Sequence, residues 1–287
     1  MINALEIKNL SKTYEQSNFH LDEINLTIPK GIIMGIVGKN GAGKSTIINS
    51  IFDITKKDCG EITFYGELLN EQSKNLKNNI GVVFDTLSYS EELNALKLER
   101  VLKDLYKNFD SALFNSYLEK FDLPKDKKFK TFSRGMTMKL SISVAISHGA
   151  KFLVLDEATA GLDPVTREEI LDIFLEFASN EDNSILMSSH ITSDLERVAD
   201  YITFVDNGKI ILTENKDNLI YNYGIARMKE IEFSKLLKEE YIAYRKRGLQ
   251  IEVLLKDKYV LAKKYPETII DNAKLDEILP LLTKGDK

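Results

Sequence analysis

The 287-residue chain has one cysteine, no surplus of basic residues and no long apolar run. The single cysteine, Cys59, excludes an internal disulfide and a metal site made of several cysteines. The formal net charge of −5 argues against a general nucleic-acid-binding protein, because no excess of lysine and arginine is available to neutralise phosphates. No apolar stretch approaches the roughly 20 residues of a membrane-spanning helix, so we expect any membrane role to act through a partner.

The remaining composition is that of an ordinary globular protein. Hydrophobic residues make up 43% of the chain and charged residues 29%, and the length allows one large domain, alone or with a small appendage. Residues 1–6 lack the basic start and apolar stretch of a secretory leader, so we expect none. Two short basic runs, at 125–130 and 245–247, are interpreted as solvated surface.

A phosphate-binding loop is the most specific motif of the chain. Residues 38–46 read Gly-Lys-Asn-Gly-Ala-Gly-Lys-Ser-Thr, which matches G-x-x-x-x-G-K-[ST], and they lie between a predicted strand at 32–37 and a predicted helix at 45–52. In such a loop the backbone N–H groups point at phosphates, and the helix N-terminus adds positive potential. We predict that Lys44 reaches the β- and γ-phosphates of a nucleotide and that the Ser45 hydroxyl binds Mg²⁺. The alternative is a chance glycine-rich turn.

Two acids follow a hydrophobic run further along the chain. Residues 152–155 read Phe-Leu-Val-Leu and predict a buried parallel strand that delivers Asp156 and Glu157 to the carboxyl edge of the sheet. There Asp156 could hold Mg²⁺, directly or through water, and Glu157 could orient or deprotonate the attacking water. The alternative is a strand that ends in surface acids, which the phosphate loop upstream makes the less favoured interpretation.

His190 follows the next predicted strand, at 185–187. A lone histidine after a strand is more often a surface residue than a catalytic one. A strand edge beside a γ-phosphate is nevertheless where a polar sensor would lie, so we keep His190 as a candidate. The turn at 160–164 lies between the two strands.

Other patterns predict the surrounding elements. Alternating residues predict strands at 4–10 and 24–28, the Asn-Gly pair at 207–208 predicts a hairpin over 202–213, and helical spacing covers 91–121. Residues 140–147 alternate like a strand but also repeat every four residues like a helix, and periodicity alone does not decide between them. Beyond 213 the motifs stop, and a strand-like run at 250–255 and a helix-like end at 275–282 predict a small folded appendage.

The order of these motifs resembles the ATP-binding subunits of ABC transporters, over about residues 4–215. Tyr14 matches the aromatic that stacks on adenine, 38–46 the Walker A loop, and Asp85 the Q-loop position. Residues 132–136, Phe-Ser-Arg-Gly-Met, lie at the signature motif, 154–157 at Walker B, 161–163 at the D-loop, and His190 at the switch histidine.

The resemblance implies a set of site residues. ATP would be bound by Tyr14, Gly38, Asn40, Gly41, Gly43, Lys44, Ser45, Thr46, Asp85, Ser133, Gly135 and Asp163; Mg²⁺ would be bound by Ser45, Asp85 and Asp156; and ATP hydrolysis would depend on Lys44, Glu157 and His190. The residues after Gly135 would form a helix.

The resemblance also implies an α/β fold and an assembly. The fold would be a P-loop NTPase core of the ABC type with a mixed, mainly parallel sheet, an antiparallel β subdomain, a helical subdomain and a small C-terminal α+β appendage. We expect an ATP-binding domain at 1–215, with the helical subdomain at about 86–150, and an accessory region at 216–287. Two ATP-binding subunits, identical or related, would pair head to tail over two ATP molecules at the cytoplasmic face of the membrane. A separate integral membrane subunit would contact the helical subdomain.

Four positions depart from the family pattern. Asp85 replaces a glutamine, Arg134 and Met136 replace a glycine and a glutamine of the signature, and Ala158 replaces a proline. These changes could be subfamily drift with hydrolysis intact, or they could make a slow or asymmetric site. The retained serine, glycine, glutamate and histidine of the motifs favour competent hydrolysis.

The signature and the tail resemble those of ABC-2-type exporters of peptides and antibiotics, including exporters of lantibiotics, bacitracin-like peptides and phenol-soluble modulins. Two other functions remain open from the sequence. One is a regulatory or immunity ABC ATPase with low turnover. The other is an ABC protein that acts on ribosomes or DNA, which is disfavoured because the chain has a single ATP-binding domain and only a short helical insertion.

Overall fold

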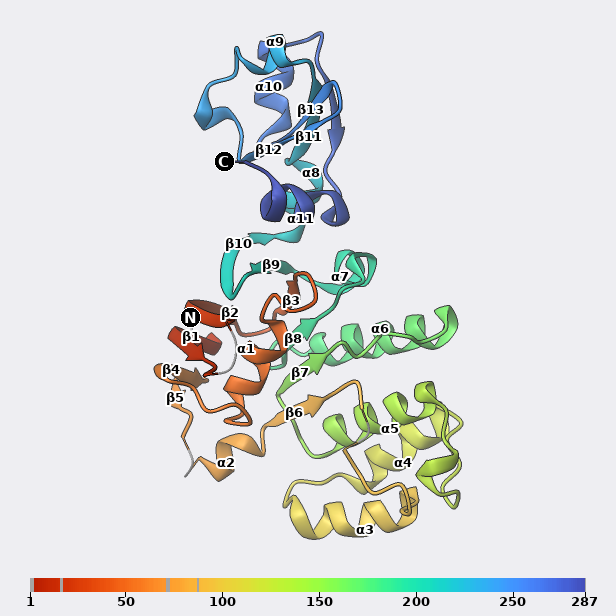
Figure 1. Ribbon diagram of the computed structural model, residues 1–287. Coiled ribbons are helices and arrows are strands. Elements are labelled where there is room, and N and C mark those ends of the chain that lie inside the picture. Colours follow the sequence, from red (N-terminus) through yellow and green to blue (C-terminus); the bar gives the residue numbers. More distant parts are fainter. Residues whose placement is uncertain (1–2, 16–17, 71–72, 87, 287) are drawn as a thin grey trace.

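The computed structural model describes residues 3–15, 18–70, 73–86 and 88–286. Within these ranges the strands form three sheets. Figure 1 shows the C-terminal region at one end of the molecule, the large sheet in the middle and a group of helices at the other end. None of the helices in the described ranges has both the length and the apolar character needed to cross a bilayer.

The first sheet is antiparallel and has the order β2-β1-β4-β5. Its strands are β1 (Asn3–Thr13), β2 (His20–Pro29), β4 (Cys59–Phe64) and β5 (Glu67–Leu68). Three buried apolar pairs connect β1 and β2, namely Leu5 with Ile28, Ile7 with Leu26, and Leu10 with Ile24. Such cross-strand pairs stabilise a sheet that buries one face, and they confirm the strands predicted at 4–10 and 24–28.

The central sheet has the order β10-β9-β3-β8-β7-β6, parallel except for β10. Its strands are β3 (Ile33–Val37), β6 (Ile80–Val83), β7 (Phe152–Asp156), β8 (Ser184–Ser188), β9 (Tyr201–Asp206) and β10 (Lys209–Asn215). The hairpin predicted around Asn207-Gly208 is confirmed, and both residues have positive φ, as a tight two-residue turn requires. A Cβ at Gly208 would lie 1.8 Å from the backbone oxygen of His20, so only glycine fits there.

Two hydrophobic layers cover the two faces of the central sheet. Alternate residues of a strand point to opposite faces: Phe152 and Val154 of β7 face the first sheet and helix α1 (Lys44–Ile51), whereas Leu153 and Leu155 face the other helices. The covering elements are α5 (Arg134–Ser147), α6 (Pro164–Ala178) and α7 (Thr192–Val198). This burial on both faces explains why β7 is a continuous apolar run.

The helical region is built from capped helices. Besides α5 it contains α3 (Ala95–Leu105), α4 (Ser111–Lys120) and the 3₁₀ turn η1 (Phe129–Thr131). The short helix α2 (Lys74–Lys77) lies outside this region, and its Leu76 belongs to the hydrophobic core beneath the first sheet. The helical pattern predicted over 91–121 is two helices, because Asp110 caps α4 by accepting a hydrogen bond from the N–H of Leu113 at 2.9 Å. The ambiguous segment 140–147 is helical and buried throughout, which explains why no single period dominates its sequence.

The C-terminal region folds as an α+β unit, as predicted. An antiparallel sheet of order β12-β13-β11-β14 combines β11 (Gly224–Met228), β12 (Ala243–Arg247), β13 (Gln250–Leu255) and β14 (Ile269–Asn272). Its helical elements are α8 (Lys216–Tyr221), α9 (Glu230–Phe233), η2 (Lys238–Glu240), α10 (Lys258–Lys264) and α11 (Leu275–Lys284).

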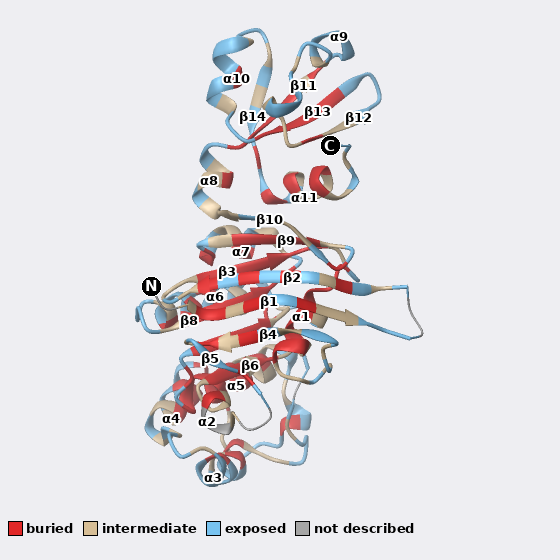
Figure 2. Cartoon of the chain, turned by 90° about the vertical axis from the view of Figure 1, so that its left-hand side faces the viewer, coloured by how far each residue is buried: buried red, intermediate tan, exposed pale blue. Residues whose placement is uncertain are grey.

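Helix α11 joins this unit to the central domain. Its buried residues Leu275 and Ile278 belong to the same hydrophobic core as Leu195 and Val198 of α7, and Figure 2 shows buried segments in both helices. The carboxylate of Glu196 in α7 accepts a hydrogen bond from the backbone N–H of Leu275 at 3.0 Å. An acidic group from α7 therefore caps the positive end of α11.

The basic run 245–247 is not wholly solvated surface, and that prediction is wrong for Arg245. Glu252 in β13 is buried and accepts hydrogen bonds from Arg245 at 2.6 Å and Arg247 at 3.3 Å. Burial acts to raise the pKa of Glu252, but the hydrogen bonds and charges of the two arginines outweigh it and hold the pKa below its usual value.

Glu252→Ala is expected to lower the free energy of unfolding by about 2 kcal/mol, because two charge-assisted hydrogen bonds are lost. In the wild type, this contribution is present above the unfolded pKa of about 4.3 and is lost as the pH falls through the lower folded pKa. Urea unfolding at several pH values measures both effects. Glu230→Ala, which removes an exposed pair with Lys246, serves as the control and should change little. Equal stability of the two variants at neutral pH would contradict the prediction.

Candidate nucleotide-binding site

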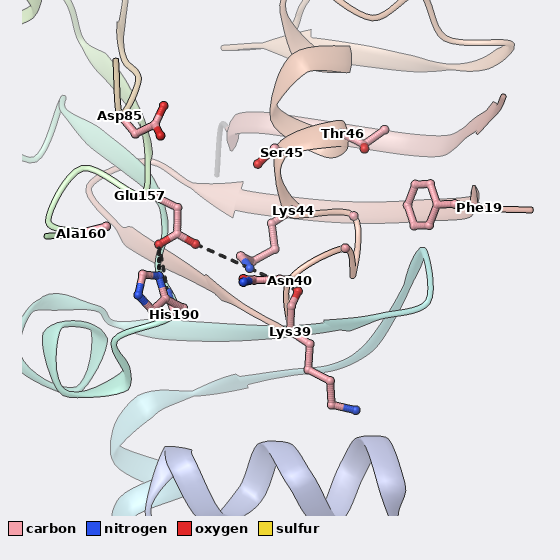
Figure 3. A pocket seen from close by; sticks show the side chains of 12 residues that line it. Phe19, Lys39, Asn40, Lys44, Ser45, Thr46, Asp85, Glu157, Ala160 and His190 are labelled. Carbon is pink, nitrogen blue, oxygen red and sulfur yellow. Dashed lines mark hydrogen bonds and ion pairs between the residues drawn. The ribbon is translucent and has the colours of Figure 1, made fainter. Parts of the chain in front are cut away.

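A cavity of about 570 Å³ lies where β3, β7 and β8 end. The carboxyl ends of parallel strands meet at one edge of a sheet, so motifs that are far apart in the sequence converge there. Figure 3 shows the side chains around this cavity. The lining residues are Phe19, Lys39, Asn40, Gly41, Gly43, Lys44, Ser45, Thr46, Asp85, Glu157, Ala160 and His190.

The predicted phosphate loop lies between β3 and α1, in the strand–loop–helix order that the motif requires. Gly43 has φ 115° and directly precedes the first residue of α1. A Cβ at Gly38 would lie 2.4 Å from the backbone oxygen of Val205, so the loop passes too close to β9 for any other residue. The N-terminus of α1 therefore opens onto the cavity with backbone N–H groups that have no partner within the helix.

Lys44 is buried at the base of the loop. Its Nζ donates hydrogen bonds to the backbone oxygens of Gly38 at 2.8 Å and Lys39 at 3.4 Å, and it lies 3.6 Å from Oε1 of Glu157. The two carbonyl oxygens fix the ammonium group close to the cavity, where a triphosphate could take the place of the glutamate as its anionic partner.

Glu157 lies between Lys44 and His190, as the dashed lines in Figure 3 show. Its Oε2 accepts hydrogen bonds from the backbone N–H of His190 at 3.2 Å and from Nδ1 of the imidazole at 2.5 Å. The carboxylate is thus held at a defined point of the cavity wall, while the His190 side chain is about half exposed. A carboxylate held in this way could act chemically as a base or as a group that orients water.

Asp156 does not line the cavity, although the next residue, Glu157, does. The Oδ1 atom of Asp156 accepts a hydrogen bond from the hydroxyl of Ser188 at 2.5 Å, and among the described residues its Oδ2 has no hydrogen-bond partner. Ser45 and Asp85 do line the cavity. The described part of the chain has no group of three or more His, Cys, Asp or Glu that could hold a metal. The side-chain oxygens of Ser45, Asp85 and Asp156 suit Mg²⁺, because this ion binds through one or two protein oxygens together with waters and substrate phosphates.

The aromatic residue in the described lining of the cavity is Phe19, which is not among the residues predicted from the sequence. Tyr14 lies next to it, with its ring centroid 6.3 Å from that of Phe19 and the ammonium group of Lys12 5.6 Å from its own centroid. Phe19 lies at the end of the cavity away from Glu157 (Figure 3). Stacking of Tyr14 on adenine stays a prediction; a search for a second aromatic just before β2 would have found Phe19.

Comparisons with known proteins identify the family of the chain. Residues 21–160 match the model of the ABC transporter family. The lantibiotic transport ATP-binding protein SrtF of Streptococcus pyogenes is 34% identical over 238 residues, which cover 82% of this chain and 99% of that protein. The chain belongs to the ABC transporter family.

Two further matches support the membership. The bacitracin transport ATP-binding protein BcrA of Enterococcus faecalis is 30% identical over 75% of this ABC chain and 70% of its own. A solved structure of the ATP-binding subunit of an ABC transporter has a TM-score of 0.68 at 26% identity, covering 75% of this chain and 91% of that one. The predicted fold class is therefore confirmed, and the protein is an ABC ATPase, the ATP-binding subunit of a transporter.

The signature residues of this ABC ATPase lie apart from the phosphate loop. Ser133, Gly135 and Asp163 line a second hollow of about 280 Å³ whose lining shares no residue with the first cavity. Ser133 caps α5 by accepting a hydrogen bond from the N–H of Met136 at 3.2 Å, and Asp163 caps α6 in the same way. The single chain therefore does not bring the signature to its own Lys44.

The residues that depart from the family pattern differ in their surroundings. The Asp85 side chain is exposed at the first cavity. The guanidinium group of Arg134 lies against Gly161, where an added Cβ would be 3.0 Å from one of its nitrogens. Ala158 is fully buried, where a small apolar residue packs without a polar cost.

Proposed function

We propose that this chain is the ATP-hydrolysing motor of an exporter and acts with a separate integral membrane subunit. The substrate class proposed is a peptide or a peptide antibiotic. The support is the similarity to SrtF and BcrA, whose names refer to lantibiotic and bacitracin transport. The location that follows is the cytoplasmic face of the membrane, with the chain attached through its partner.

The observation that carries the proposal is the convergence of Lys44, Glu157 and His190 on one cavity beside a phosphate loop. Lys44 and the N–H groups of the loop would hold the β- and γ-phosphates, with Tyr14 beside the base. The residues assigned to ATP are Gly38, Asn40, Gly41, Gly43, Lys44, Ser45, Thr46 and Asp85. Ser45, Asp85 and Asp156 would hold Mg²⁺, which neutralises charge on the phosphate oxygens.

Glu157 would act on the attacking water as a base or an orienting group. In the structure its carboxylate is bonded to His190 and lies near Lys44. When phosphates engage Lys44, Glu157 loses its cationic neighbour and keeps the histidine. The Nδ1–H of His190 donates to the carboxylate, so the same imidazole that senses the phosphate end of the cavity also orients the base.

A second copy or a related subunit would complete the site. Because Ser133, Gly135 and Asp163 lie on a separate hollow, a head-to-tail pair would place this hollow over the partner's phosphates. The N-terminus of α5 would then face the γ-phosphate. Residues 1–215 would form the ATP-binding domain, and the helical part at 86–150 would contact the membrane subunit. Residues 216–287 would form an accessory region attached through α11.

Head-to-tail pairing is tested by sedimentation of the Glu157→Gln protein with Mg²⁺ and ATP. The slow variant is expected to sediment as a dimer with ATP and as a monomer without it. Adding Ser133→Arg, which places a long side chain in the signature hollow, should abolish the dimer. If the double variant still dimerises, the hollow does not face a partner's nucleotide.

The export function is tested by measuring the ATPase rate with and without the membrane protein that co-purifies in detergent. Stimulation by that protein is expected. A low rate that no membrane protein changes would favour a regulatory or immunity ATPase, the function that the substitutions at Asp85 and Arg134 left open. Recovery of ribosomes or DNA without a membrane protein would contradict the proposal, which includes no nucleic-acid partner.

A further inference from the structure

Ser188 lies between the proposed metal ligand and the proposed base. It is the last residue of β8, where it pairs with Asp156 of the neighbouring strand β7, and it is fully buried. Its hydroxyl donates to Oδ1 of Asp156 at 2.5 Å. The backbone N–H of Glu157 donates to the same hydroxyl oxygen at 3.1 Å and to the backbone oxygen of Ser188 at 3.2 Å.

The hydroxyl has one proton and two acceptor lone pairs. The proton is used on the carboxylate of Asp156, because an ionised carboxylate only accepts. A lone pair then accepts from the N–H of Glu157. One buried oxygen atom therefore connects the two acidic residues, the proposed metal ligand Asp156 and the proposed base Glu157.

The backbone of Glu157 needs such support. Its φ is 53°, in the left-handed region, where a residue with a side chain is strained unless its surroundings hold it. The bonds to Ser188 hold the backbone at one end, and the bonds to His190 hold the carboxylate at the other. The orientation of the base is thus determined at both ends.

We propose that Ser188 is a positioning residue for ATP hydrolysis, which links the metal-binding carboxylate of Asp156 to the backbone of the base Glu157. Its hydroxyl occupies Oδ1 and leaves Oδ2 for Mg²⁺ or a water bound to it. Groups that orient a ligating carboxylate typically change metal affinity or activity by 10–100-fold when they are removed. The inference rests on the roles proposed above for Asp156 and Glu157.

The sequence offers a matched control. Ser184 is the first residue of the same strand β8, is equally buried, and its hydroxyl accepts a hydrogen bond from the backbone N–H of Gly31 at 3.0 Å. Ser184→Ala therefore removes a buried hydroxyl from the same strand at the end away from the cavity. Comparing it with Ser188→Ala distinguishes the effect of a hydroxyl beside the cavity from the stability cost of removing any buried hydroxyl from this strand.

The experiment measures the affinity of the ADP complex for Mn²⁺ by electron paramagnetic resonance, together with kcat and KM for ATP hydrolysis. Ser188→Ala is expected to bind Mn²⁺ at least about tenfold more weakly and to lower kcat by about as much. Binding of ADP without metal and the thermal midpoint should match those of Ser184→Ala. Ser188→Thr, which keeps the hydroxyl, should restore the metal affinity.

Metal affinity and kcat of Ser188→Ala equal to those of Ser184→Ala would overturn the inference. If Ser188→Ala does not fold, Ser188→Cys keeps the volume with only a weak donor, and the same comparison is made with it. A wild-type chain without ATPase activity would contradict the proposed function, yet the Mn²⁺ comparison would still decide on Ser188. A normal wild type with an unaffected Ser188→Ala would contradict this inference alone.

Discussion

Glu157→Gln is expected to lower kcat for ATP hydrolysis by about 10²–10⁴-fold, the range for loss of a general base. Glutamine keeps the size of the side chain and can still accept the hydrogen bond from the backbone N–H of His190, but it cannot take a proton from water. ATP binding is expected to persist, because the phosphate loop is unchanged. Steady-state hydrolysis and fluorescent-nucleotide binding measure the two effects separately.

Glu119→Gln provides the control for this prediction. Glu119 is an exposed residue of α4 that pairs with Lys125 far from the cavity motifs, and its loss should leave kcat unchanged. Hydrolysis by Glu157→Gln at the wild-type rate would rule out Glu157 as the base. A parallel loss of ATP binding would instead assign Glu157 to the ground-state complex.

Lys44→Ala is expected to weaken ATP binding by roughly 10–100-fold, the equivalent of one or two charge-assisted hydrogen bonds. The ammonium group is already fixed by two backbone oxygens, so little side-chain entropy is lost when it engages phosphate. Hydrolysis is expected to fall as well, since Lys44 no longer stabilises the negative charge on the phosphate oxygens. Titration with a fluorescent ATP analogue gives the affinity.

Lys57→Ala is the matched control, because this lysine follows α1 and pairs with Asp53 outside the cavity lining. It should bind ATP as the wild type does. Equal affinities of the two variants would show that the phosphates do not engage Lys44. If Lys44→Ala loses thermal stability, the result would indicate that Lys44 stabilises the loop rather than binds the nucleotide.

The elements around the site could be predicted because their patterns are local. The strands at 4–10, 24–28 and 152–155, and the hairpin at 207–208, follow from alternation, apolar runs and turn chemistry, each of which depends on neighbouring residues. The helix at 140–147 could not be decided in this way. It is buried on all sides, and a uniformly buried segment carries no amphipathic period.

The site residues that belong to sequence motifs were predicted, and those that reach their place only through tertiary packing were missed. Lys44, Glu157 and His190 come from motif order, and the structure brings all three to one cavity. Phe19 was missed because its place in the cavity depends on the approach of its ring to Gly43 of the phosphate loop, a contact between separate segments. Outside the site, the partial burial of Arg245 was missed because its hydrogen-bond partner Glu252 lies on a neighbouring strand.

The amino-acid sequence by itself determined the family and the order of the chemical groups, because each motif is contained within a few consecutive residues. Tertiary structure decided which of these groups meet. Parallel strands bring Asp156 and Ser188 side by side although they are 32 residues apart, and they leave the signature hollow separate from the phosphate loop. Strand order and helix docking set these distances, and both result from burial of surfaces that no short segment contains.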